Sequence, residues 1–559
     1  MAEKKSIGEI HTLVSDFEKK YSALHNRMDG DFDLWRLKDY KLDQMSDNVT
    51  STYPRFYAQA ILGQMSGAKP ILTVHRMDGN GEKEALMERG FFGWLRLVDE
   101  NLAARLLPPL QSVSSFMAAI RGGIAGRGIF YKDGTPEIFP YDPRYLSWGM
   151  DSKGVIWSAY STWREPYSIE FEYNYSPKKK RKDITTGKEE PATAARVIEW
   201  IDGKYYMVIV DNQIVNDSDH SWERPPVFLV PVGTSPMIVS TGDKYDYIDT
   251  WLESIYGSSR ALYEVQNRVL SIWLSLLGKS HDPSYFVFTP DGQMKITDTP
   301  WGKGQMMPLP SDAKVQLVEP PDIANSAPQF FNIISTLIGQ GDYTPLFYGQ
   351  LYKGQELSGR SLQSIYQNVQ QVKGVLLQSL SVFYKIALKS LGSQYLKLDN
   401  NMTVSGYDSK GTHFISEVTP DIYDGDYELE VDFRSIGPEE EAENYAKAQL
   451  AKTSMLASDD FIRENIIKFQ DPDKVSRQMY VEAAEKINPQ IAMMRMIEAL
   501  QKEGKNEEAA IIAGQLKLQL MQSIPQQGMG QQGQPPKSPE SQMPQTQPIN
   551  PPNIPIGGR

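Results

Sequence analysis

A proline-free stretch in the middle of the chain, 246–277, restricts the possible folds more than any other part of the sequence. Its apolar side chains recur at helical spacing, which predicts one helix of about thirty residues, roughly 45 Å long. The small residues Gly257, Ser258 and Ser259 interrupt its middle, where we expect a bend. A helix of this length has to pack against other helices along its whole length. The residues expected to mark its packing stripe are Trp251, Ile255, Leu262, Val269 and Trp273.

A strand-rich insert and a second helix follow this stretch directly. Residues 278–323 contain the β-type runs SYFVF, QMKITD and KVQLVEP, separated by glycine- and proline-containing turns. Residues 325–341 (NSAPQFFNIISTLIGQG) then return to helical periodicity. This order predicts two antiparallel helices with a compact β cap at their far end, which together form a stalk.

The tripeptide Gly278-Lys279-Ser280 matches the last three positions of a phosphate-binding loop, G-x-x-x-x-G-K-[ST]. The first glycine of that motif would fall at Trp273, and the preceding residues are predicted as helix rather than strand. Pro283 stands close to where the motif needs a helix to begin. We therefore interpret Gly278 as a helix C-cap, with Lys279 at the negative end of the helix dipole, and predict no nucleotide site.

The part before residue 246 divides into a mostly helical half, about 5–125, and a strand-rich half, about 126–235. A helix is expected to begin near Pro54 and to end at Gly67. The pairs Asp202-Gly203 and Asp211-Asn212 indicate hairpin turns. The runs predicted as strands are IFYKDG, EIFPYDP, GVIWSAYSTW, SIEFEYNY, ARVIEWIDGKYYMVIVDNQIV and PPVFLVPVG.

A basic run, PKKKRK at 177–182, interrupts these strands and has two interpretations. The plainer one is a solvated hairpin tip, and the other is a contact with nucleic acid or a localisation signal.

A glycine-punctuated loop, 341–361, follows the stalk and contains several aromatic residues. They could stack on bases, with basic residues nearby for phosphate, although core packing of such a loop explains them equally well. The residues considered are Tyr343, Phe347, Tyr348, Tyr352, Lys353 and Arg360.

The remainder of the chain is predicted as a long helix over 358–392, strands over 394–435, and helices from there to about residue 522. Pro438, Pro472 and Pro489 are each expected at the first position of a helix. Beyond Ser523 the chain is Gln, Pro and Gly with few aliphatic side chains, and we expect it to be disordered.

Composition argues against several classes of function. The net charge of −12 disfavours a protein that coats nucleic acid by neutralising phosphates. The absence of cysteine rules out disulfides, thiolate metal sites and a cysteine nucleophile. The acidic turns around Asp142, Asp151 and 421–426 do not fit calcium-loop spacing, and no two histidines have helical metal-site spacing. We therefore predict no cofactor, no metal and no catalytic residues.

The sequence also predicts no membrane association. No run of eighteen apolar residues occurs, and the N-terminus lacks the apolar core of a signal peptide. We expect a protein that works in a cytoplasm or in a particle assembled there.

The order of these parts resembles the portal proteins of tailed bacteriophages, over about residues 30–520. The segment FPYDPRYLSWGMDSKGVIWSAYSTWREPYSIE is similar to that family's wing signature. The resemblance implies an α+β portal fold, assembled as a ring. Its parts would be an N-terminal helical region and wing (1–245), a stem helix (246–277), a clip (278–323), a returning stem helix (324–341), a tunnel loop (342–360), a long wing helix with wing strands (361–435), a helical crown (436–522) and a tail (523–559).

The resemblance also implies a function and partners. The chain would be a structural virion protein whose dodecameric ring at one capsid vertex carries double-stranded DNA during packaging and ejection. Its partners would be the terminase large subunit, a head-tail adaptor, and the capsid and scaffolding proteins. Tyr343, Tyr348, Tyr352, Lys353 and Arg360 are the candidates for the tunnel loop. Those for docking at the clip are Lys279, His281, Trp301 and Lys303.

Two alternatives remain at this point. One is another structural protein of the head-tail junction or tail, which would be expected to contain more β structure or repeats. The other is a nucleotide-dependent DNA motor or nuclease, which would need an ATPase signature or an acidic metal cluster.

Overall fold

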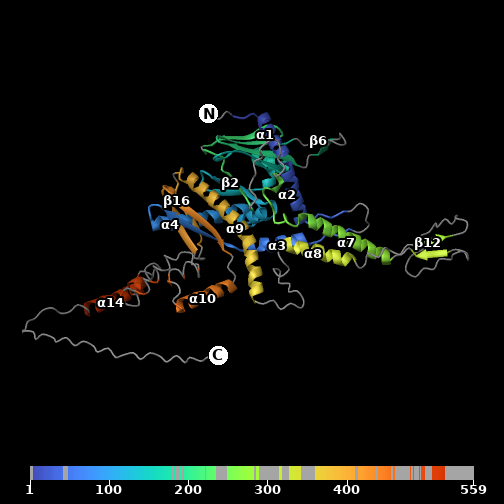
Figure 1. Ribbon diagram of the computed structural model, residues 1–559. Helices are drawn as coiled ribbons and strands as arrows, with labels where there is room; N and C mark the ends of the chain where they lie inside the picture. Colours follow the sequence, from blue (N-terminus) through green and yellow to red (C-terminus); the bar gives the residue numbers. More distant parts are fainter. Residues whose placement is uncertain are drawn as a thin grey trace, which may run out of the picture. The chain divides into compact units, whose positions relative to one another are not determined.

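The computed structural model describes most of the chain and divides it into two compact units, Met1–Gly437 and Pro438–Arg559 (Figure 1). The described residues are 4–233 except 42–47, 178–179, 183–188, 192–193 and 221; then 248–281, 285–288, 314–317, 326–341, 359–434 except 399 and 409–412, 438–454, 506–522, and isolated residues and short stretches between 458 and 497. Helices and sheets are mixed throughout the first unit, so the predicted α+β class is confirmed.

The N-terminal region is helical, as predicted, but it also contains one strand. Ser6 caps the first helix reciprocally with Glu9, and the third helix begins beside Pro54 with Gly67 as its C-cap. The helices are α1 (Ile7–Lys20), α2 (Ser22–Trp35), α3 (Tyr53–Ser66), α4 (Gly81–Ala104) and α5 (Leu110–Phe116), followed by a π-helical turn, η1 (Met117–Arg121).

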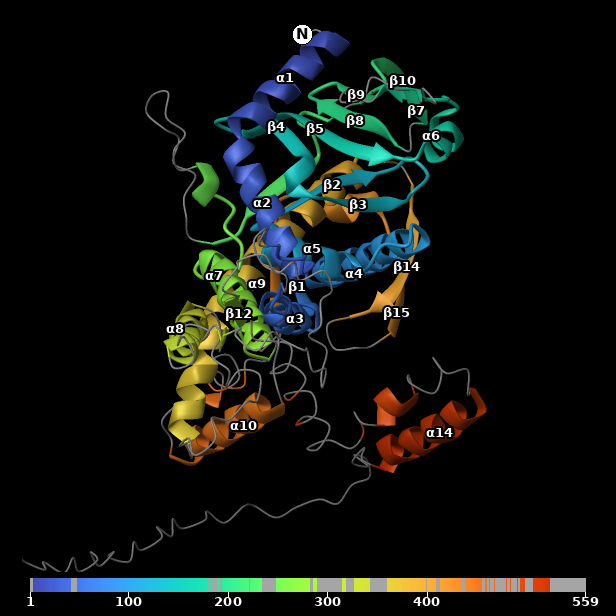
Figure 2. The same cartoon turned by 90° about the vertical axis from the view of Figure 1, so that its right-hand side faces the viewer.

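Two antiparallel sheets form the strand-rich region. A three-stranded sheet has the order β11 (Val227–Pro231), β2 (Gly123–Phe130), β3 (Pro136–Tyr141). A five-stranded sheet has the order β10 (Gln213–Asp219), β9 (Tyr205–Val210), β8 (Ala195–Asp202), β5 (Gly154–Arg164), β4 (Leu146–Asp151). The two predicted hairpin turns are confirmed, since Asp211 and Asn212 both have left-handed backbone angles and residues 203–204 join β8 to β9. Figure 2 shows α1 along the five-stranded sheet, where Ile10 and Val14 pack against Trp200.

A pairing that the sequence did not predict joins the two ends of this unit. Strand β1 (Lys69–Arg76) pairs antiparallel with β16 (Tyr427–Arg434) in the register Lys69↔Arg434. The long helix α9 (Gly359–Tyr395), close to its predicted bounds, packs on β2, β11 and β16. Strands β14 (Met402–Tyr407) and β15 (His413–Val418) form a hairpin against α4. A Cβ on Gly93 of α4 would lie 2.5 Å from the Cβ of Val404, so this close approach requires glycine.

The helix predicted over 246–277 is shorter than expected. Only Arg260–His281 is helical (α7), while Ile248–Thr250 forms a 3-10 turn and 251–259 form turns. The chain before α7 is instead held by the strand-rich region: Trp251 is buried beside Trp148, with ring centroids 5.7 Å apart. Leu252 packs so closely that a Cβ on Gly122 would lie 1.7 Å from its carbonyl oxygen. These contacts require turns where periodicity alone predicted helix.

Two further expectations are wrong. Helix α7 continues through Gly278 to His281, so Gly278 is not its C-cap. Residues predicted as the strand SIEFEYNY mostly form α6 (Pro166–Tyr173). Pro166 occupies the first helical turn, and Ile169 is buried against β8 and β9, so packing overrides the apparent alternation.

The other predicted elements are present wherever the structure describes them. The basic run lies partly in β6 (Lys180–Lys182), which pairs with β7 (Glu189–Pro191), so these residues belong to a strand of a hairpin and not to its tip. In the second unit, α10 (Pro438–Thr453) begins at Pro438 as predicted, and α14 spans Asn506–Gln522. The predicted helix starts at Pro472 and Pro489 and the tail beyond Ser523 lie outside the described residues.

Candidate functional site

The predicted stalk corresponds to a pair of helices with a small sheet beyond them. Helix α8 (Ser326–Gly341) packs beside α7, and the ring centroids of Trp273 and Phe331 lie 6.5 Å apart. Strands β12 (Tyr285–Phe288) and β13 (Lys314–Leu317) lie between these helices in sequence and pair antiparallel. Figure 1 shows α7 and α8 side by side, with β12 beyond the far end of α7.

Helix α8 has two adjacent apolar faces with opposite environments. Ile334 and Ile338 are buried in the main core. Phe330, Ile333 and Leu337 follow the neighbouring face and are 50%, 56% and 44% exposed. The spacing of three and four residues places these side chains in one row, which we call the α8 stripe. An apolar row of this kind on a surface helix is typical of a protein-protein contact.

The base of α7 is anchored to α2 by buried charges. Arg260 Nη2 donates to Asp31 Oδ2 at 3.0 Å, and the Asp31 side chain is fully buried. Arg27 lies 3.8 Å from the same carboxylate and also donates to the Leu252 and Asp249 carbonyls. Glu253 pairs with both arginines. Along α7, Ser51 N donates to Asn267 Oδ1 at 2.8 Å and Val49 N donates to Ser271 Oγ at 2.9 Å.

The predicted stem residues do not form a single stripe. Leu262, Val269 and Trp273 lie on α7, where the first two pack partly buried against the main core. Trp251 and Ile255 precede the helix, so their assignment to the stem helix is wrong. Trp251 belongs to the core between α2 and the five-stranded sheet.

Most of the residues predicted for docking at the clip and for the tunnel loop lie outside the described residues. Tyr343, Tyr348, Tyr352, Lys353, Trp301 and Lys303 lie outside the described residues. Lys279 and His281 are in the last turn of α7, and Arg360 is at the start of α9. The proposed roles of all these residues stay predictions.

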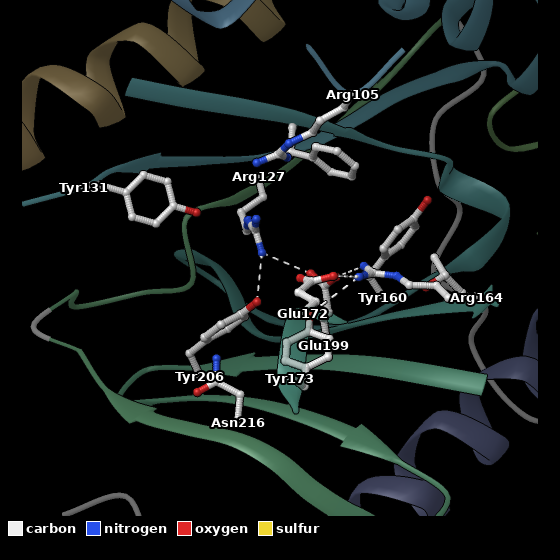
Figure 3. A pocket seen from close by; sticks show the side chains of 12 residues that line it. Arg105, Arg127, Tyr131, Tyr160, Arg164, Glu172, Tyr173, Glu199, Tyr206 and Asn216 are labelled. Carbon is white, nitrogen blue, oxygen red and sulfur yellow. Dashed lines mark hydrogen bonds and ion pairs between the residues drawn. The ribbon is translucent and has the colours of Figure 1, made fainter. Parts of the chain in front are cut away.

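Sequence reasoning missed a charged cavity of about 640 Å³ between the three-stranded and the five-stranded sheet (Figure 3). Side chains of β2, β3, β5, β8, β9 and β10 line it, with contributions from Tyr131 after β2, from α6 and from Arg105 at the end of α4. The lining residues are Arg105, Arg127, Tyr131, Phe139, Tyr160, Thr162, Arg164, Glu172, Tyr173, Glu199, Tyr206 and Asn216.

Arg127 is the centre of this cavity's charge network. Its guanidinium donates to Glu199 Oε2 at 3.0 Å, Glu137 Oε2 at 2.9 Å and the Tyr206 hydroxyl at 3.2 Å. Burial raises the pKa of the Tyr206 hydroxyl to about 12. Burial alone would raise the pKa of Glu137, but Arg127 and the Tyr131 hydroxyl lower it below the usual value. Glu137 is therefore held as a buried carboxylate.

The described residues contain neither a candidate metal cluster nor a candidate membrane span. No group of three or more His, Cys, Asp or Glu side chains there could hold a metal ion. Within the same residues, no helix combines the length and apolar character of a membrane span.

Comparison with known proteins adds little. No protein-family model matches the sequence, and no curated protein matches it. Among solved structures, the chain is similar to a chain from the neck of an empty GTA particle computed with C6 symmetry. The two chains are 11% identical with a TM-score of 0.38, over 74% of this chain and 89% of the other. We draw nothing about function from a similarity of this size.

Proposed function

We propose that this chain is a portal protein of a tailed bacteriophage or related particle. Its copies would form a dodecameric ring at one capsid vertex, through which double-stranded DNA enters and leaves. The observation that carries the proposal is the order of elements α7, β12, β13, α8 and α9. A helix leads out to a small sheet, a second helix returns beside it, and a long helix then crosses the wing, as the resemblance to portals implies.

The α8 stripe supports assembly into a ring. Phe330, Ile333 and Leu337 are exposed in the single chain, whereas Ile334 and Ile338 on the same helix are buried. In a closed ring each subunit offers one face to one neighbour and a different face to the other. We propose that the α8 stripe is one of these faces and packs on the helix pair of the adjacent subunit.

The remaining parts of the proposal concern partners. The small sheet β12–β13, with Lys279 and His281 near it in sequence, would dock first the terminase large subunit and later a head-tail adaptor. The capsid and scaffolding proteins would contact the ring from outside. The net charge of −12 suits a channel along which DNA slides, because a strongly basic wall would hold phosphates in place.

Under this proposal the chain is not an enzyme and carries no cofactor. Gly278, Lys279 and Ser280 lie within the last turn of α7, whereas a phosphate-binding loop precedes a helix, which argues against the motor alternative. The alternative of another head-tail or tail structural protein does not require a dodecameric ring at the capsid vertex. Assembly is therefore the property to test.

The test is the substitution Ile333→Asp, with Asn332→Asp as the matched control. Both side chains are exposed on α8, but only Ile333 belongs to the α8 stripe. Burying an unpaired carboxylate in a subunit interface is unfavourable, so Ile333→Asp should yield monomers in sedimentation velocity. Asn332→Asp should sediment like the unmodified ring. Equal assembly of both variants would contradict the role of the stripe.

A further inference from the structure

The cavity between the two sheets has no role in the proposed ring, and its charge balance is unlike that of the chain. Its lining contains three arginines and two glutamates, and a third glutamate, Glu137, pairs with two of these arginines, so the cluster is close to neutral in a chain that carries −12. The arginines are Arg105, Arg127 and Arg164, and they come from three different elements. We propose that this cavity binds a small oxyanion of the phosphate or carboxylate class.

Arg127 provides the buried part of the site. The residue is 7% exposed, and its Nε has no hydrogen-bond partner among the described residues. A guanidinium has five N–H donors, and an unpaired donor in a buried position is costly. Figure 3 shows Arg127 in the middle of the lining, between Arg105 and the glutamates. This Nε atom is shielded from the cavity, so Arg127 acts on an anion through its buried positive charge and not through that donor.

Arg105 provides a second cation, on the solvent-exposed side of the cavity. Its Nη1 lies 2.7 Å from Glu137 Oε1, and its guanidinium lies over the ring of Phe139 at 5.3 Å. The side chain is nevertheless 50% exposed, so its other donors can reach a ligand. Planar guanidinium groups suit the oxygens of phosphate and carboxylate, which they can bind in pairs.

The two glutamates in the lining differ in exposure, and only the exposed one can be replaced by an anion. Glu199 is 5% exposed and accepts from Arg127, Arg164 and the Tyr141 hydroxyl, so it is a fixed part of the wall. Glu172 on α6 pairs with Arg164 at 3.0 Å but is 49% exposed. An exposed ion pair is screened and weak, so an incoming anion can replace Glu172 on Arg164.

A cation is a poorer match for the same cavity. Glu137 is paired with Arg127 and Arg105, and Glu199 with Arg127 and Arg164, so neither buried carboxylate is left for it. The volume of about 640 Å³ falls within the range of pockets for small molecules. The cavity therefore leaves space for an organic group attached to the anion, beside the rings of Phe139 and Tyr206.

The test is binding of inorganic phosphate and, separately, succinate to the full-length protein, measured by calorimetry against chloride at equal ionic strength. Glu172→Gln should bind the anion more tightly, because it removes the competing carboxylate from Arg164. Arg105→Gln should bind about tenfold more weakly, since it removes one charge-assisted contact. Arg96→Gln is the control: Arg96 is a half-exposed arginine on α4 that pairs with Glu100 and does not line the cavity.

Opposite changes in Glu172→Gln and Arg105→Gln, with Arg96→Gln unchanged, would support the proposal. The stronger of the two probes would identify the anion class. Binding no stronger than that of chloride, or equal weakening in Arg105→Gln and Arg96→Gln, would overturn it. These outcomes do not depend on whether the chain forms a ring.

Discussion

Asp31 is a residue whose removal should have a large effect, because its carboxylate is fully buried between two arginines. Arg260 and Arg27 both contact it, and Arg27 is itself only 8% exposed in its side chain. Removing one partner of a buried ion pair leaves an uncompensated charge in the interior. Asp31→Ala should therefore lower the free energy of unfolding by about 3 kcal/mol in chemical denaturation.

Asp33 offers a matched control on the same helix. Its side chain is 32% exposed and pairs with Arg36 and Lys38 at the surface. Asp33→Ala should cost less than about 1 kcal/mol, as exposed ion pairs do. Similar losses for the two variants would contradict the anchoring of α7 through Asp31.

His25 should make the stability of the first unit depend on pH. Burial, helped by the nearby Arg144, lowers the pKa of its imidazole to about 4. The unfolded chain protonates this side chain near its ordinary pKa of about 6.5, but the folded protein does not. Its contribution to stability is therefore complete above about pH 6.5 and declines as the pH falls toward 4.

The measurement is the melting temperature of the protein at pH 7 and at pH 5. His25→Gln keeps a polar side chain without this titration, so its melting temperature should fall less between the two values. An equal fall in both proteins would show that other groups cause the acid sensitivity.

At the scale of single residues, the sequence predicted the residues that control backbone geometry, but it did not predict the buried charges. Pro54, Gly67 and the Asp211-Asn212 turn are where local chemistry placed them. Glu199 was missed because it lies between Ile198 and Trp200 in a strand whose residues are buried on both faces. Alternation cannot reveal which charged residue faces inward when there is no exposed face to contrast with it.

Among the elements, the α7–α8 pair makes the clearest prediction. Trp273 contacts Phe331 within the same chain. Substituting Trp273 should therefore weaken the α7–α8 pair even in a single subunit, without a neighbouring copy. Trp273→Ala should destabilise the pairing of α7 and α8 by about 2 kcal/mol, less than a fully buried tryptophan would cost. The measurement is faster amide hydrogen exchange in α8.

Leu274→Ala is the control for that experiment, because Leu274 is the next residue on α7 and is 44% exposed. It should leave exchange in α8 nearly unchanged. Comparable acceleration in both variants would mean that α7, rather than its contact with α8, had been weakened.

Helix ends and long-range pairings were the elements that sequence could not predict. Periodicity continues from 248 to 259, but Trp251 and Leu252 are held by α2 and by the turn at Gly122, and the chain cannot be helical there. Strand β1 pairs with β16, which lies more than 350 residues later in the sequence, in the register Lys69↔Arg434. Nothing local in either segment specifies that partner, because cross-strand pairing is decided by tertiary packing.

At the scale of the whole molecule, the segment between α8 and α9 should separate assembly from function. If residues 343–354 form the tunnel loop, their deletion should leave rings intact and impair DNA packaging or retention. The measurement is the ring fraction together with the amount of DNA protected from nuclease in assembled particles. Loss of rings in this deletion would show that the segment is part of the structural core.

The central claim is that copies of this chain close into a ring. Electron microscopy of the purified full-length protein tests it most directly, because class averages report both symmetry and the presence of a central channel. The proposal predicts uniform rings with a central hole and dodecameric symmetry. Monomers or open filaments at the same concentration would contradict it.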